Sequence, residues 1–201
     1  MKLVGITGGI GTGKSTVAGI LQKRGWTVYE SDATSKELMA TDGELRAELA
    51  AHFGSEVLTT NGVNATVLAQ LVFGPSAEHQ ERLNTLNRLV HPRVLQAHMD
   101  AIAHEHESGT PIVAIASALL FEAELEEGFD WVIVVDAPEE LCIQRVVARQ
   151  NLAPEEVRRR MERQMPMEQK RGLADFVIEN AGTPEELQNA TDLVALLIET
   201  M

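Results

Sequence analysis

The chain has 201 residues, of which 30 are acidic and 17 basic, so its formal net charge is −13. A hydrophobic fraction of 44% is typical of a globular protein, and this length allows folding without disulfides or structural metals. The acidic balance argues against a surface that binds nucleic acid or anionic membranes. Cys142 is the only cysteine, which excludes an intramolecular disulfide and favours a reducing cytoplasm. We expect no signal peptide, because the apolar run near the N-terminus is short and broken by glycines. We expect no membrane span, because no apolar run reaches about 18 residues.

Short apolar runs rich in β-branched residues alternate along the chain with helical patterns, and this alternation predicts an α/β fold with a parallel sheet. The runs at 111–116 and 131–136 are apolar almost throughout, which is typical of strands with helices on both faces. The predicted strands are 2–7, 27–29, 111–116, 131–136 and 176–178.

The segment 36–107 contains helical patterns interrupted by glycine turns and no convincing strand. We therefore predict a helical insert there, between the second and third strands, with 1–35 and 108–201 forming the core. Asn61-Gly62 is a possible hairpin turn, but its flanks are weakly apolar, so a turn between two helices is the preferred interpretation.

A phosphate-binding loop follows the first predicted strand, because residues 8–15 (GGIGTGKS) match G-x-x-x-x-G-K-[ST] and precede a helical pattern. In such a loop the glycines let backbone N–H groups wrap phosphates, the lysine follows the γ-phosphoryl group and the serine hydroxyl binds Mg²⁺. Lys14 and Thr16 stand where a dinucleotide fingerprint requires glycine, and the D-x-x-G and N-K-x-D motifs of GTPases are absent. The predicted ATP contacts in this loop are Gly9, Ile10, Gly11, Thr12, Gly13, Lys14, Ser15 and Thr16.

Two polar residues are candidates for the acceptor side of the site. Asp32 follows the second predicted strand, where a carboxylate can deprotonate an attacking hydroxyl or cap the next helix, and the sequence leaves both roles open. His91 precedes Pro92 at the end of a helical pattern, so it marks either a helix junction or a ligand contact.

Basic residues cluster between 145 and 171, where eight of the 17 are found. Arg145 and Arg149 are four residues apart on one predicted helix face, from which both can contact a triphosphate. The arginines at 158–160 have nearby glutamates, so an ion-paired surface helix explains them. Ion pairing on a surface helix does not explain Arg149 and Lys170. We therefore predict a mobile helical lid over about 150–172, which carries basic residues over the triphosphate and excludes water during transfer.

Taken together, these segments resemble the dephospho-coenzyme A kinase family, P-loop kinases that phosphorylate the ribose 3′-hydroxyl of dephospho-CoA. The resemblance covers nearly the whole chain, and the ordered series of motifs after the phosphate loop makes it specific. The segments that carry it are 6–17 (ITGGIGTGKSTV), the Asp32 segment, 52–54 (HFG), 86–94 (LNRLVHPRV), 118–122 (ALLFE), the helix of Arg145 and Arg149, 160–175 (RMERQMPMEQKRGLAD) and 177–182 (VIENAG).

The resemblance implies a three-layer P-loop NTPase fold with a five-stranded parallel sheet, a CoA-binding insert at 36–107 and an arginine-bearing lid. It implies that Asp32 is the catalytic base, acting with Lys14, Arg145 and Arg149, and that Asn180 and Gly182 lie near adenine. The substrate contacts expected on the dephospho-CoA side are Asp32, His91, Leu119, Leu120, Phe121, Glu122 and Lys170.

Some positions depart from the family pattern: Glu30 replaces the first aspartate of a D-x-D element, Ala118 a frequent proline, and Gln150 an aspartate. Ser117 stands where a Walker B aspartate would close the third strand, so Mg²⁺ is expected on Ser15, the phosphates and water. We expect a cytoplasmic monomer that binds ATP and dephospho-CoA. The alternatives are a nucleoside or nucleoside monophosphate kinase, and a non-catalytic nucleotide-dependent switch.

Overall fold

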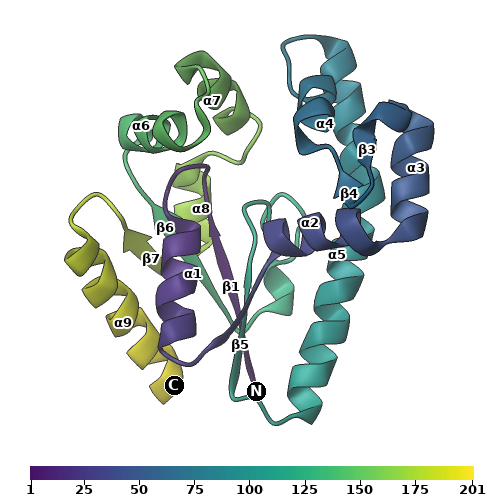
Figure 1. Ribbon diagram of the computed structural model, residues 1–201. Coiled ribbons are helices and arrows are strands. Elements are labelled where there is room, and N and C mark those ends of the chain that lie inside the picture. The colour runs from purple at the N-terminus through teal and green to yellow at the C-terminus, as the bar shows by residue number, and fades with distance from the viewer. The chain divides into compact units, whose positions relative to one another are not determined.

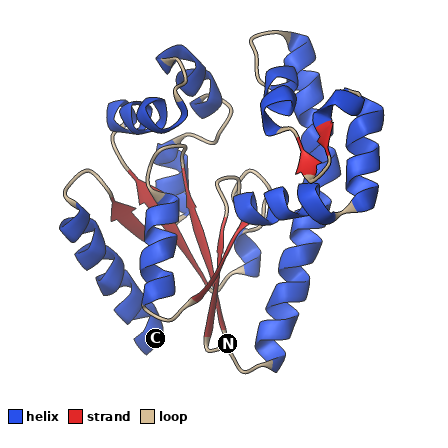
Figure 2. Cartoon of the chain, in the orientation of Figure 1, coloured by secondary structure: helices blue, strands red, loops and turns tan.

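The computed structural model describes residues 1–201, which divide into two units. The first comprises residues 1–30 and 105–201, and the second residues 31–104. No helix in either unit is both long and apolar enough to cross a membrane. Figure 1 labels the elements in chain order, and Figure 2 distinguishes helices from strands.

The first unit is built on a five-stranded parallel sheet in the order β2-β5-β1-β6-β7, which confirms the predicted fold class. The central strand β1 pairs with β5 on one side and β6 on the other, so the phosphate loop that follows it leaves the middle of the sheet. The strands are β1 (Lys2–Gly8), β2 (Thr27–Glu30), β5 (Ile112–Ala116), β6 (Trp131–Asp136) and β7 (Phe176–Glu179).

Both faces of the sheet are covered, which explains why its strands are apolar throughout. On β6, Ile133 and Val135 pack against α1 (Lys14–Lys23) and α9 (Pro184–Thr200). The alternate residues Val132 and Val134 pack on the opposite face against the 118–129 segment and the region of α8 (Met167–Leu173). The remaining elements of this unit are η2 (Glu126–Gly128), α6 (Glu139–Gln150) and α7 (Pro154–Met161), of which α6 and α7 lie side by side (Figure 1).

The second unit is mainly helical and has a hydrophobic core of its own, centred on Leu45 and Leu49, neither of which has exposed surface. Asp42 and Asn64 begin two of its helices by accepting backbone N–H groups, as N-cap residues do. Its elements are α2 (Ser31–Thr41), α3 (Gly43–Phe53), η1 (Ser55–Val57), β3 (Leu58–Thr59), β4 (Gly62–Val63), α4 (Ala65–Val72) and α5 (Ala77–Glu107), whose last residues belong to the first unit.

Two sequence interpretations of this unit are wrong. Strands β3 and β4 form a short antiparallel hairpin around Asn61, with Leu58 opposite Val63, where a turn between helices was preferred. Leu58 and Val63 pack against the core of the unit, so tertiary burial stabilises a pair whose flanks look weakly apolar in the sequence. Pro92 marks no helix junction, because α5 runs through it without a break.

Candidate active site

The phosphate loop is shaped by glycines at positions that no other residue would tolerate. Gly11 and Gly13 have φ of +82° and +98°, in the left-handed region that favours glycine. A Cβ on Gly11 would lie 2.6 Å from the carbonyl oxygen of Cys142 in α6, and one on Gly13 would overlap Nδ2 of Asn180. The loop is therefore packed closely against two other segments of the sheet's carboxyl edge.

The loop presents donors without acceptors, which is the physical mark of an anion site. Lys14 is only 8% exposed, and its Nζ is buried with no hydrogen-bond partner. The backbone N–H groups of Gly13, Lys14 and Ser15, at the start of α1, also donate to no protein acceptor. A buried ammonium group without a partner is costly, and a bound anion removes that cost. Phosphate groups fit both the charge and the position at a helix N-terminus.

The residues beside the loop also suit Mg²⁺. The Ser15 hydroxyl donates to Oε2 of Glu30, the last residue of β2, at 2.7 Å. This places a hydroxyl and a carboxylate oxygen together, and both are hard ligands of the kind that Mg²⁺ prefers. No group of three or more His, Cys, Asp or Glu residues could hold a metal by itself. Mg²⁺ at this site would therefore need ligands from phosphates and water, as is usual in nucleotide sites.

Asn180 connects the loop to the helix that carries the predicted arginines. It is 7% exposed, and its Nδ2 donates to the carbonyl oxygen of Thr12 at 2.7 Å. Nη2 of Arg145 donates to the backbone oxygen of Asn180 at 3.1 Å and to its Oδ1 at 3.3 Å. Nη1 of Arg145 is buried and has no partner, so this arginine keeps an N–H group for a further acceptor. Arg149 and Gly182 are exposed, and Arg149 forms no ion pair.

Gln164, a residue to which the sequence analysis assigned no role, also contacts the loop. Its Oε1 accepts the backbone N–H of Ile10 at 2.9 Å. Met167, three residues further on, also lies close to the loop, because a Cβ on Gly9 would be 3.2 Å from its Sδ. The sequence signal for this residue was its place in the Q-M-P element of the run at 160–175, which carries the family resemblance but assigns the glutamine no role.

The segment after β5, predicted to face the acceptor, lies mostly inside the first unit. Leu120 and Phe121 are fully buried against the sheet, while Leu119 is half-buried. Lys170 has no exposed surface, and its Nζ lies 2.9 Å from Oε1 of Glu122 and donates to Oε2 at 3.1 Å. The same Nζ donates to a backbone carbonyl oxygen at 2.8 Å. Lys170 thus contacts protein groups on the interior side of the lid segment.

Asp32 and His91 belong to the second unit. Asp32 is exposed in the first turn of α2, and its carboxylate accepts no hydrogen bond, so helix capping does not account for it. His91 lies in α5, and partial desolvation lowers its pKa from the ordinary value. His98 lies about two turns further along the same helix, and its Nε2 is 3.0 Å from the hydroxyl oxygen of Ser31.

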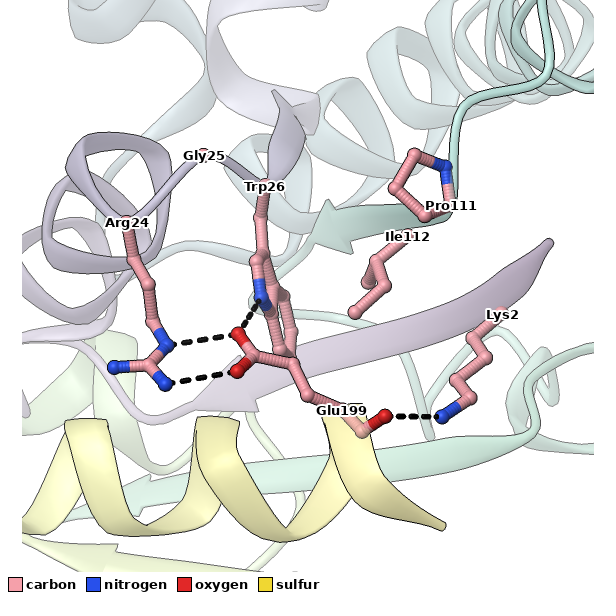
Figure 3. A pocket seen from close by; sticks show the side chains of 7 residues that line it. All are labelled: Lys2, Arg24, Gly25, Trp26, Pro111, Ile112 and Glu199. Atoms are coloured by element: carbon pink, nitrogen blue, oxygen red, sulfur yellow. Dashed lines mark hydrogen bonds and ion pairs between the residues drawn. The ribbon is translucent and has the colours of Figure 1, made fainter.

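A separate cavity of about 390 Å³ lies at the opposite edge of the sheet, where β1, β2 and β5 begin (Figure 3). The Trp26 and Ile112 side chains line it. Its charged groups all have partners within the protein. Arg24 donates to both carboxylate oxygens of Glu199, at 2.7 and 2.8 Å, and Lys2 donates to backbone carbonyl oxygens of α9. Ligands of open parallel sheets bind at the carboxyl ends of the strands, so this cavity is not the candidate site.

The phosphate loop, at the carboxyl edge of a five-stranded parallel sheet and beside arginine-bearing helices, makes the protein a P-loop kinase. A family profile narrows that class, because the one described as dephospho-CoA kinase matches residues 2–186. The chain belongs to the dephospho-CoA kinase family.

Individual proteins agree with the profile. A dephospho-CoA kinase of Chlorobium chlorochromatii is 40% identical over 194 residues, which cover 94% of this chain and 90% of the relative. One of Thermobifida fusca is 40% identical over 188 residues, with 93% and 91% covered. The solved structure of a dephospho-CoA kinase from Campylobacter jejuni, 23% identical, has a TM-score of 0.71 with 100% of this chain and 98% of that chain covered. The last comparison shows that the fold is shared.

Proposed function

We propose that this protein transfers the γ-phosphoryl group of ATP to the ribose 3′-hydroxyl of dephospho-CoA, which yields coenzyme A in the final step of its synthesis. Membership of the dephospho-CoA kinase family supports both the donor and the acceptor. The observation that carries the proposal within the chain is Lys14, whose buried Nζ has no partner and stands beside the unpaired N–H groups of residues 13–15. Nothing favours the alternative acceptors, nucleosides and nucleoside monophosphates.

On the donor side, the loop at 9–16 holds the phosphates and Lys14 follows the γ-phosphoryl group to its new position. Arg145 supplies the N–H group that Asn180 leaves free, and Arg149 adds a second cation from the same helix. Ser15 and Glu30 would hold Mg²⁺, which would neutralise charge that develops on the phosphate oxygens. Gly182 and Asn180 border the adenine end of the nucleotide.

On the acceptor side, Asp32 accepts the proton of the attacking 3′-hydroxyl and orients it in line with the γ-phosphoryl group. Its carboxylate is suited to this role because no protein group occupies it. The helical insert at 36–107 binds dephospho-CoA, with His91 among its contacts, and the 119–122 segment borders the same substrate. The lid at about 150–172, which stays anchored to Glu122 through Met165 and Lys170, closes during transfer and excludes water.

The proposal includes a monomer located in the cytoplasm. The single cysteine is buried and unpaired, which suits a reducing compartment, and burial raises the pKa of its thiol. A net charge of −13 gives no reason to expect contact with nucleic acid or anionic membranes.

The test is product formation by the purified protein with Mg·ATP and dephospho-CoA, followed by ADP release and by mass detection of coenzyme A. AMP, CMP, UMP and dTMP serve as rival acceptors. We expect coenzyme A from dephospho-CoA alone, and a fall of kcat by about 100-fold or more in both Lys14→Ala and Asp32→Asn. Glu37→Gln, an exposed change on the same helix as Asp32, is the matched control and should leave kcat unchanged. Turnover near the wild-type rate in Asp32→Asn would refute its role as base.

A further inference from the structure

The segment 164–170 contacts two parts of the first unit that are far apart in the sequence. At its start, Oε1 of Gln164 accepts the N–H of Ile10 in the phosphate loop at 2.9 Å. The next residue, Met165, donates its backbone N–H to Oε1 of Glu122 at 2.8 Å. At the end of the segment, Lys170 forms its ion pair with the same Glu122. The phosphate loop and the segment that follows β5 are therefore joined through these residues.

The Glu122 end of this connection is a firm anchor. Lys170 has no exposed surface, and the Glu122 side chain is 20% exposed. Separating such a pair leaves a buried charge without a partner, so the two residues resist moving apart. Because Met165 is bound to the same carboxylate, the backbone directly after Gln164 is fixed as well. The position of Gln164 is thus set by an ion pair on the acceptor side of the unit.

The Gln164 end has the chemistry needed beside a triphosphate. Its carboxamide is neutral, so it does not repel phosphate oxygens as a carboxylate would. The oxygen is occupied by Ile10, whereas Nε2 forms no hydrogen bond and the side chain is half-buried. Holding Ile10 restrains the loop near its apex, four residues before Lys14.

We propose that Gln164 is a positioning residue for phosphoryl transfer: fixed by the Glu122–Lys170 pair, it holds the phosphate loop at Ile10 and aligns the γ-phosphoryl group with the acceptor. The reaction in this statement rests on the proposed function. Phosphoryl transfer depends chiefly on position, and a displacement of about 1 Å can cost about 100-fold in rate. A hydrogen bond to the loop backbone is therefore enough to affect kcat.

The first test compares Gln164→Ala with Gln169→Ala, which changes an exposed glutamine of the same segment whose side chain forms no hydrogen bond. Steady-state kinetics give kcat and KM, and calorimetric titration with ATP gives Kd without the acceptor. We expect Gln164→Ala to lower kcat by about 10- to 100-fold, with a smaller change in the Kd of ATP, and Gln169→Ala to match the wild type. An unchanged kcat, or an equal loss in both variants, would overturn the proposal.

A second readout does not depend on the reaction. Hydrogen–deuterium exchange of the nucleotide-free protein should show the Ile10 amide protected in the wild type and exchanging faster in Gln164→Ala. If the wild type made no coenzyme A but this difference were seen, the proposed function would fail while the contact stood. Equal exchange in the two proteins would remove the contact on which the inference rests, whatever the reaction.

The coupling to the anchor is tested with a double-mutant cycle. Glu122→Gln should also lower kcat, and Gln164→Ala combined with it should lower kcat no further than the more damaging single change, because both act through one position. If the two effects multiplied, the anchor and Gln164 would act separately and the proposed coupling would be wrong. If the Glu122→Gln protein does not fold, Lys170→Met takes its place in the cycle, because that variant breaks the same ion pair and removes the buried ammonium group of Lys170.

Discussion

Replacement of Asn180 tests how the phosphate loop is held. In Asn180→Ala the carbonyl oxygen of Thr12 loses the donor that lies 2.7 Å away in a buried position, and Arg145 loses one of its two acceptors. A buried polar group left without its partner costs about 1–3 kcal/mol, so the free energy of unfolding should fall by about that amount. Arg145 keeps its bond to the backbone oxygen of residue 180, which limits the loss.

Asn180→Asp separates the hydrogen bond from the volume of the side chain. The aspartate has almost the same size, but it turns an oxygen toward the Thr12 carbonyl and adds a negative charge beside the phosphate loop. We expect Asn180→Ala to weaken ATP binding about tenfold, or about 1.4 kcal/mol, and Asn180→Asp to weaken it further. Pairing with Arg145 should leave the aspartate variant no less stable than the alanine variant.

Urea unfolding measures the stability of each variant, and calorimetric titration measures the Kd of ATP. Asn189→Ala is the matched control, because Asn189 is exposed on α9 and its side chain forms no hydrogen bond. The reasoning would be refuted by an Asn180→Ala protein with wild-type stability and affinity. Tighter ATP binding in Asn180→Asp than in Asn180→Ala would refute the electrostatic part of it.

Three further results are expected. Gly13→Ala should abolish ATP binding in a titration, because the added methyl group would overlap the Asn180 carboxamide and because φ at this position is +98°, which disfavours alanine. Retained affinity would contradict the packing described for the loop. Glu122→Gln should lower the urea-derived stability by about 3–5 kcal/mol and Lys170→Met by less, since only the former leaves a buried ammonium group unpaired; the reverse order would contradict this. The Arg24 guanidinium lowers the pKa of Glu199 from 4.5 to about 2, so this carboxylate stabilises the fold above about pH 4.5 and loses that effect as the pH falls toward 2. The stability difference between wild type and Glu199→Gln should be about 1 kcal/mol at pH 7 and shrink over that range, and a constant difference would exclude the ionic contribution.

The parts of the fold that could be predicted from the sequence are those determined by neighbouring residues. The strands depend on local runs of β-branched residues, and the phosphate loop depends on glycine and lysine at fixed spacing. The surroundings of Lys170 could not be predicted in this way, because its partner Glu122 is 48 residues away and the sequence does not show that the pair is buried. Arg171 shows the opposite outcome for a nearby cation, since it pairs with carboxylates at the surface.

The same distinction applies to the candidate site. The sequence showed which residue types bind phosphate, but the contacts of Asn180 and Gln164 depend on segments that only the folded sheet brings together. Both side chains are neutral amides, and a basic cluster or a glycine motif does not point to them. The hairpin around Asn61 was the less favoured of two interpretations for a related reason, because its two short strands are stabilised by packing against the core of the second unit.

The close approach of Gly11 to the backbone of Cys142 limits how variants of this enzyme can be engineered. A side chain at position 11 would meet main-chain atoms, at 2.6 Å from the carbonyl oxygen, and main chain cannot rotate away as a side chain can. A library that varies the loop alone will therefore contain no useful substitution at that position. A substitution at position 11 would have to be combined with a change in the first turn of α6, so the two segments form one unit of design.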